Sequence, residues 1–109
     1  MVSDFKWAKL VVACLKQLRE SKECRVPFVD HEVIPPLTGS PDGIFVWFIC
    51  EYVVLKERFR AEALSAATER LRTMLVDAGL PVASVESLRS DVTSREEIEA
   101  GGGKFYFFR

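Results

Sequence analysis

Apolar side chains recur at helical spacing in two long segments of the chain. The first covers residues 4–20, where four apolar side chains fall on one face: Ala8, Val11, Leu15 and Leu18. The second covers residues 56–81, and its stripe consists of Leu64, Ala67, Leu71, Met74 or Leu75, and Ala78. Gly79 and Pro81 at its end are typical of helix termination. A stripe of this period packs one side of a helix on a core, so both segments are predicted to be amphipathic helices.

Segments rich in β-branched and aromatic residues predict four strands: 24–34, 43–55, 82–90 and 104–109. Pro27 removes one backbone donor from the first of them, which places that strand at a sheet edge. The dipeptide Asp42-Gly43 after Pro41 is typical of a turn, because Asp supplies an acceptor and Gly tolerates positive φ.

The strand predicted for residues 43–55 is apolar on both faces. One face carries Ile44, Val46, Phe48, Cys50, Tyr52 and Val54; the other carries Phe45, Trp47, Ile49, Val53 and Leu55, with Glu51 as its polar exception. A strand with one solvated face should alternate between apolar and polar residues. This strand is therefore either central and covered on both faces, or its second face meets another chain.

A short helix over residues 95–100 is predicted by its start and its end. Ser94 with Glu97 has the spacing of a capping box, as does Thr93 with Glu96. The three glycines 101–103 then precede Lys104, but a phosphate-binding loop needs the order strand, glycine loop, helix. Here the order is helix, glycines, strand, so we interpret the glycines as a sharp chain reversal that uses positive φ.

The predicted order α-β-β-α-β-(short α)-β defines an α+β fold with a single domain over residues 1–109. We expect a two-layer sandwich of about four mostly antiparallel strands with the two long helices on one face. Moving the last strand to the front gives the order β-α-β-β-α-β, so the order is also compatible with a permuted ferredoxin-like arrangement.

Composition narrows the class of protein. Hydrophobic residues make up 49% and charged residues 28%, which favours a soluble globular domain over a disordered chain. The formal net charge of -1 gives no support to nucleic-acid binding. The odd number of cysteines, 3, and their wide spacing argue against a disulfide framework, which favours a reducing, cytoplasmic setting. No segment predicts a signal peptide or a membrane span.

Three residues are candidates for chemistry: His31 within the run Asp30-His31-Glu32, Cys50, and Glu51. Asp30 and Glu32 should share one face of a strand while His31 takes the other, so the three do not converge. A buried cysteine is unreactive, and Cys50 lies on a strand predicted to be buried. We predict no metal, no cofactor and no catalytic set here.

Glu51 is the one charge within the apolar strand, and a buried carboxylate needs a partner. The sequence offers four candidate cations for an ion pair: Arg109, Lys104, Arg25 and His31. Exposure at the end of the strand is one alternative interpretation of this charge, and a pocket near Glu51 and His31 is another.

Two helices on one face of a sheet leave its other face open. The residues expected there are the aromatic and apolar side chains Phe45, Trp47, Ile49, Tyr106 and Phe108, and such a patch marks an interaction surface. The sequence therefore favours a small protein-interaction module of inhibitor, immunity or adaptor type that forms a homodimer or binds a protein partner. One alternative is a small-molecule-binding regulatory domain with a pocket near Glu51. Another is a small enzyme that uses His31, Glu51 or Cys50.

Overall fold

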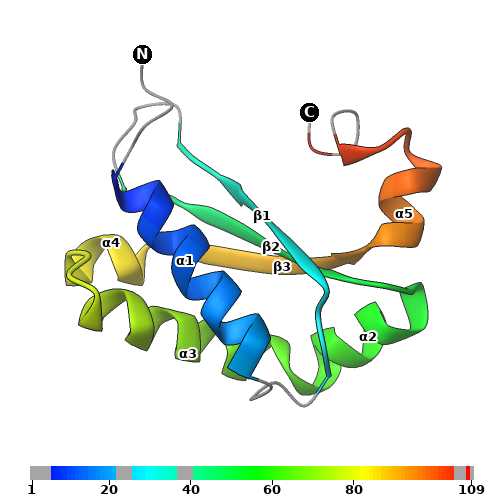
Figure 1. Cartoon of the computed structure of the whole chain (residues 1–109), viewed down its shortest axis with the longest axis horizontal. Helices are drawn as coiled ribbons and strands as arrows, with labels where there is room; N and C mark the ends of the chain where they lie inside the picture. Colours follow the sequence, from blue (N-terminus) through cyan, green and yellow to red (C-terminus); the bar gives the residue numbers. More distant parts are fainter. Residues whose placement is uncertain (1–5, 22–25, 37–40, 105–107, 109) are drawn as a thin grey trace.

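The structure, a computed structural model, describes residues 6–21, 26–36, 41–104 and 108 (Figure 1). Within these residues the elements follow the chain in this order: α1 (Lys6–Ser21), β1 (Asp30–Ile34), β2 (Phe45–Cys50), α2 (Val53–Glu62), α3 (Leu64–Asp77), α4 (Val82–Glu86), β3 (Arg89–Ser94) and α5 (Arg95–Ala100). Helices pack on a mixed sheet, so the predicted α+β class is confirmed.

The described strands form one sheet in the order β1-β2-β3, with β2 in the centre. β1 runs antiparallel to β2, with His31 opposite Phe48, and β3 runs parallel to β2, with Val92 opposite Phe48. The expected mostly antiparallel sheet is therefore a mixed one. A ferredoxin-like arrangement splits its β-α-β unit with a further strand, whereas here β2 and β3 pair directly.

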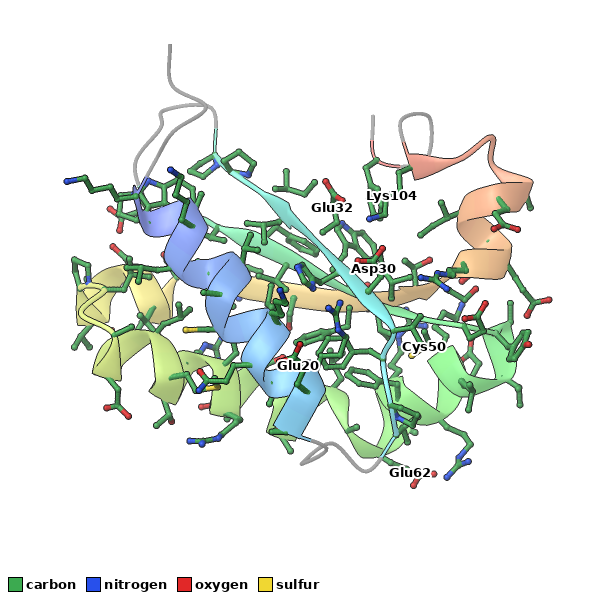
Figure 2. All side chains as sticks on the ribbon, in the orientation of Figure 1. Glu20, Asp30, Glu32, Cys50, Glu62 and Lys104 are labelled. Atoms are coloured by element: carbon green, nitrogen blue, oxygen red, sulfur yellow. The ribbon has the colours of Figure 1, made fainter. Side chains whose placement is uncertain are left out.

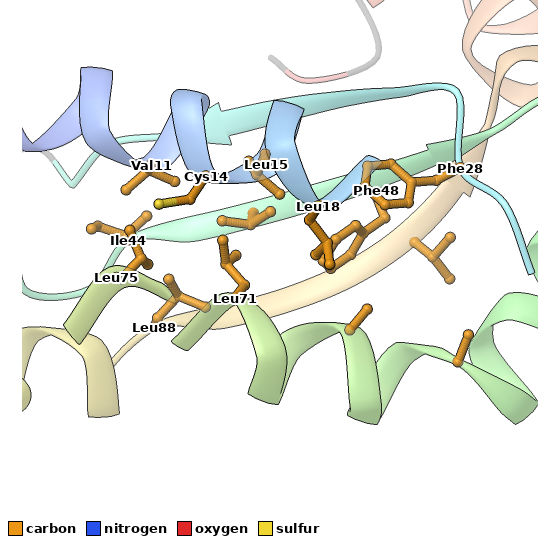
Figure 3. Close-up of a cluster of buried hydrophobic side chains, with 14 of the residues drawn as sticks. Val11, Cys14, Leu15, Leu18, Phe28, Ile44, Phe48, Leu71, Leu75 and Leu88 are labelled. Carbon is orange, nitrogen blue, oxygen red and sulfur yellow. The ribbon is translucent and has the colours of Figure 1, made fainter. Parts of the chain in front are cut away.

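One face of the sheet packs on α1, α2 and α3, as predicted for the two long helical segments. Val46, Phe48 and Cys50 of β2 point to this helix-facing side and are 0% exposed. Phe48 meets Phe28 and Phe59 with ring centroids 5.0 and 5.3 Å apart, in the core shown in Figure 3. Burial of each such side chain contributes about 1.5–3 kcal/mol, so this side holds the fold together.

The amphipathic stripe of α1 meets that core as its spacing predicts. Val11, Leu15 and Leu18 are buried, and Cys14 fills the gap between them. From α3, Leu71 and Leu75 approach the same cluster (Figure 3). The two helices thus form one layer over the sheet.

The boundary between the strand predicted at 43–55 and the helix predicted at 56–81 lies earlier than expected, and the predicted helix is broken in two. The strand ends at Cys50, and α2 already begins at Val53. A break at Ala63, with φ -129 and ψ -22, then separates α2 from α3. The early helix start places Lys56 and Phe59 against the sheet, and this tertiary packing outweighs the strand propensity of the apolar run.

The strand predicted at 82–90 is wrong in its first half. Residues Val82–Glu86 form the short helix α4, which begins directly after Pro81, a residue well suited to a helix start. Buried Ser84 donates to Asp42 Oδ1 at 2.6 Å, and this bond ties α4 to the loop before β2. β3 therefore begins only at Arg89 and extends through the threonine and serine that we expected to be caps alone.

The chain reverses after α5, as predicted from the glycines. Gly103 N–H donates to Ile98 O at 2.8 Å and Gly102 N–H to Glu99 O at 3.1 Å, the bond pair of a Schellman motif. Gly102 and Gly103 have φ of 94 and 96. The predicted strand 104–109 lies mostly outside the described residues. Its two described residues are not in a strand, because Phe108 N–H donates to Lys104 O at 3.1 Å, a bond of helical spacing. Lys104 pairs with Asp30 and Phe108 meets Trp47, so both lie over the face of the sheet opposite the three long helices.

Candidate functional site

Three aromatic side chains meet on the face of the sheet opposite α1, α2 and α3. Phe45 and Trp47 alternate with the buried core residues of β2, and their ring centroids are 5.3 Å apart. Phe108 lies 5.6 Å from Trp47 by the same measure. All three are partly buried. These residues, Phe45, Trp47 and Phe108, are called the aromatic row below, and each was predicted from the sequence to lie on an interaction surface.

Of the two other residues of that predicted surface, Ile49 does not join the row and Tyr106 cannot be placed. Ile49 is 0% exposed, so it offers no surface to a partner in this structure. The reason is α5, which folds back over this end of the sheet and buries Ile98 to 5% exposure beside it. Tyr106 falls outside the described residues.

A charged cluster of Asp30, Glu32 and Lys104 (Figure 2) lies beside the aromatic row, because Glu32 is opposite Trp47 in the sheet. Lys104 Nζ is 2.8 Å from Asp30 Oδ2 and 3.4 Å from Glu32 Oε1. Partial burial alone would raise the pKa of Asp30, but hydrogen bonds from Lys104 and from the His31 amide outweigh it and lower that pKa. The cluster fastens the residue after the glycine turn to the edge strand β1.

His31 takes the other side of β1, as the alternation of the strand predicts. Its Nδ1 atom is buried and has no hydrogen-bond partner within the described residues. Burial, and then the positive charge of Arg19 on α1, lower the pKa of its imidazole. His31 and the two carboxylates beside it therefore do not converge on one site.

Glu51 forms an ion pair with Arg95, which is not among the four cations expected from the sequence; of those four, Arg25 and Arg109 lie outside the described residues. Arg95 Nη1 lies 3.0 Å from Glu51 Oε1, and the two side chains remain 46% and 36% exposed. The strand ends one residue before Glu51, so the carboxylate reaches the start of α5 instead of the core. The carboxylate is thus paired, but at a partly exposed strand end and not within the core.

Cys50 is 0% exposed among the apolar residues of the core. A substrate therefore does not reach its sulfur in this structure, in agreement with the inert thiol expected from the sequence. Cys14 is likewise buried, and this burial raises the pKa of its thiol. Cys24 lies outside the described residues.

A set of polar contacts at the ends of β2 and β3 was not predicted from the sequence. Lys56 Nζ lies 3.0 Å from Glu97 Oε2, and Ser94 Oγ caps α5 by accepting from the Glu97 amide at 3.2 Å. The bond to Glu97 raises the pKa of Lys56. The capping box was visible in the sequence, but no local pattern indicates that Lys56, 41 residues away, completes it.

The outer edge of β3 is occupied by side chains of the helix layer. Arg72 donates to Leu88 O at 2.7 Å, and Arg60 donates to Val92 O at 3.2 Å. Asp91 Oδ1 accepts from the Val92 amide at 2.8 Å. Backbone groups that an added strand would need are thus already bonded.

The free edge of β1 is also protected. It is only 5 residues long and is followed directly by Pro35 and Pro36. The Asp30 side chain accepts from the His31 amide at 2.8 Å, so this donor is occupied. A short edge strand with prolines and charges resists pairing with another strand.

Comparison with known proteins finds no matching family model, no matching curated protein and no matching solved structure. In the described part of the chain, no three histidine, cysteine or acidic side chains are grouped as a metal site would require. None of the helices described here has the length and apolar character needed to cross a bilayer.

Proposed function

We propose that this protein is a cytoplasmic protein-interaction module that forms a homodimer through the aromatic row. The observation that carries this proposal is the contact of Phe45, Trp47 and Phe108 on the face of the sheet that the three long helices leave uncovered. Aromatic side chains supply large contact areas and are enriched at the centres of protein interfaces.

The blocked edges of the sheet favour the face over the edges as the contact surface. Arginine side chains occupy carbonyl groups along β3, and β1 is short and flanked by prolines. A second copy that adds a strand at either edge would lose these bonds. Two aromatic rows related by a two-fold axis would instead pack on each other without disturbing either sheet. The net charge of -1 adds little repulsion between copies.

The alternative of an enzyme has weaker support from the positions of its candidate residues. Cys50 is fully buried, His31 lies on the helix-facing side of β1, and Glu51 is paired at the surface. Nucleic acid is an unlikely partner because the charges of α2 and α3 alternate in sign and form ion pairs of their own, such as Arg58 with Glu62 at 3.7 Å.

Sedimentation equilibrium tests the proposal over a range of protein concentrations. We expect the wild-type chain to dimerise at micromolar concentration, and Trp47→Glu and Phe45→Glu each to shift it to monomer. The matched control is Val12→Glu, which places the same charge on an apolar residue that is 42% exposed on α1, away from the aromatic row. It should leave the dimer intact.

Circular dichroism and a denaturant melt of each variant separate loss of association from loss of fold. A wild-type chain that remains monomeric at high concentration would contradict self-association. Equal weakening by Val12→Glu would move the interface to α1.

A further inference from the structure

The face that carries the aromatic row is higher at one end than at the other. α5 follows β3 and covers Ile49, which is 0% exposed, whereas Phe45 at the start of β2 remains partly exposed. In the view of Figure 1, α5 rises above the sheet while α2 and α3 lie below it. The face is therefore raised where β2 ends and low where β2 begins.

This shape limits how the faces of two copies can pack on each other. If the β2 strands of the two copies ran parallel, α5 of one copy would lie against α5 of the other and hold the aromatic rows apart. If the strands run antiparallel, the raised end of each face lies over the low start of the other. A two-fold axis between the faces, at right angles to the strands, relates the copies in this way.

Two charged residues of β3 lie beside the aromatic row. β3 pairs with β2 in parallel register, with Arg89 opposite Phe45 and Asp91 opposite Trp47. Residues that pair directly in neighbouring strands point to the same face of a sheet, and residues two apart in one strand share a face. A positive charge therefore stands next to Phe45 and a negative charge next to Trp47.

Both charged groups are available to a second copy. Arg89 is exposed, and its guanidinium forms no ion pair with any described residue. The side chain of Asp91 is 39% exposed, and its Oδ1 atom accepts from Arg60 at 3.1 Å and from the Val92 amide at 2.8 Å. Neither bond uses Oδ2, and a carboxylate has about four lone-pair sites, so Asp91 can accept from a further donor.

The positions of these charges select one register of the antiparallel arrangement. An axis over Trp47 would set Asp91 against Asp91 of the second copy. An axis over Phe45 would set Arg89 against Arg89, and like charges that meet across an interface are unfavourable. An axis midway between Phe45 and Trp47 sets each Arg89 against Asp91 of the other copy. It also places each Phe45 against Trp47 and Phe108 of the other copy.

We propose that Arg89 and Asp91 determine which partner the aromatic row accepts, because each Arg89 pairs with Asp91 of a second copy across an antiparallel, face-to-face dimer. This inference rests on the proposed function, which places the dimer contact on the aromatic row. The aromatic side chains supply contact area, whereas the two charge pairs fix the register and disfavour partners that lack the same alternation of charge. The partner that fits both is a second copy of this chain.

Charge reversals test the pairing by sedimentation equilibrium and native mass spectrometry. Arg89→Asp sets carboxylates against each other and Asp91→Arg sets guanidinium groups against each other, so each variant alone should dimerise at least about tenfold more weakly than the wild type. An equimolar mixture of the two variants restores both opposite-charge pairs, so a heterodimer should form with an affinity within about threefold of the wild-type dimer. Arg58→Asp, a reversal at an exposed arginine of α2, is the matched control and should dimerise as the wild type does.

A further variant guards against a loss of fold in Asp91→Arg, which also gives up the pair with Arg60. Asp91→Asn keeps the shape of the side chain and removes its charge. Added to Arg89→Asp, it removes the repulsion between carboxylates, so the double variant should dimerise at least about threefold more tightly than Arg89→Asp alone. Melting curves by circular dichroism confirm that each variant is folded before its association is compared.

The proposed pairing is overturned if the reversals leave the dimer unchanged, or if the mixed variants associate no better than each variant alone. Either result leaves the proposed function standing, provided that the wild-type chain dimerises and Trp47→Glu dissociates it. A wild-type chain that remains monomeric would contradict both.

Discussion

The two faces of β2 carry equally apolar residues but have different surroundings. On one face, Val46, Phe48 and Cys50 are all 0% exposed beneath the three long helices. On the other, only Ile49 is fully covered, while Phe45 and Trp47 remain partly exposed. Apolar side chains on the helix-facing side therefore stabilise the fold, whereas on the opposite side Trp47 meets Phe108 and the aromatic row keeps the exposed surface on which the proposed dimer depends.

Truncation of one ring on each face should separate the two roles most clearly. Phe48→Ala removes a ring that contacts Phe28 and Phe59, and we expect a loss of about 3–5 kcal/mol in the free energy of unfolding. Phe45→Ala, on the partly exposed face, should cost about 1 kcal/mol. Urea denaturation monitored by circular dichroism measures both values. Equal losses would show that the second face is as tightly packed as the first.

The second prediction concerns the turn that brings the chain back over the second face. Gly103 has φ +96, and a side chain there would meet no atom within 4 Å, so a substitution isolates backbone strain. Gly103→Val should therefore cost at least about 1–2 kcal/mol. Gly101, with φ -88, is the control, and Gly101→Val should change stability by no more than about 0.5 kcal/mol. The positive φ expected of the three glycines is therefore found at Gly102 and Gly103 but not at Gly101.

The helices and strands also differ in how far each could be predicted from the sequence. The stripe of α1, the end of α3 at Gly79 and the capping box of Ser94 with Glu97 all follow from spacing within one element, and all are confirmed. The end of β2 does not follow from spacing, because short apolar runs fit strand and buried helix equally well. The residue at which β2 ends depends instead on the packing of Phe59, several residues further along the chain.

Some features of the candidate site could likewise be predicted from spacing within one strand, whereas others depend on the fold. Alternation along β1 predicts that Asp30 and Glu32 lie apart from His31, since this depends only on strand geometry. The pair of Glu51 with Arg95 joins residues 44 positions apart and exists only because α5 folds back over the sheet. No local pattern contains that information, so Arg95 was not among the partners expected for Glu51.

The third prediction uses His31, whose imidazole is partly buried beneath α1. Burial, and next the charge of Arg19, lower its pKa in the folded state below the ordinary value of 6.5. The unfolded chain therefore binds this proton first as the pH falls, so the free energy of unfolding should decrease as pH is lowered from about 7 toward 5 and level off below the folded-state pKa.

Denaturant midpoints at several pH values measure this slope. His31→Gln should flatten it between about pH 5 and 7, because Gln does not titrate. The neighbouring carboxyl of Asp30 also has a lowered pKa, starting from 3.8, so its stabilising effect is lost only in more acidic solution. A slope that persists in His31→Gln would assign the pH dependence to another group.

The smallest effect is expected for Glu51→Gln, which tests whether the carboxylate within the apolar run is structural. Glu51 and Arg95 remain 36% and 46% exposed, and ion pairs at this exposure contribute about 0–1 kcal/mol. We expect the unfolding free energy to change by no more than about 0.5 kcal/mol, and a double-mutant cycle with Arg95→Gln to give a coupling of similar size that shrinks in high salt.

Glu97→Gln is the matched comparison, because its partner Lys56 has a side chain only 11% exposed. Loss of that carboxylate leaves the ammonium of this largely buried side chain with Glu57, 3.1 Å away, as its remaining carboxylate, so it should cost more, about 1–2 kcal/mol. If Glu51→Gln instead proved the costlier of the two, the carboxylate would lie in a far drier environment than the end of β2 provides.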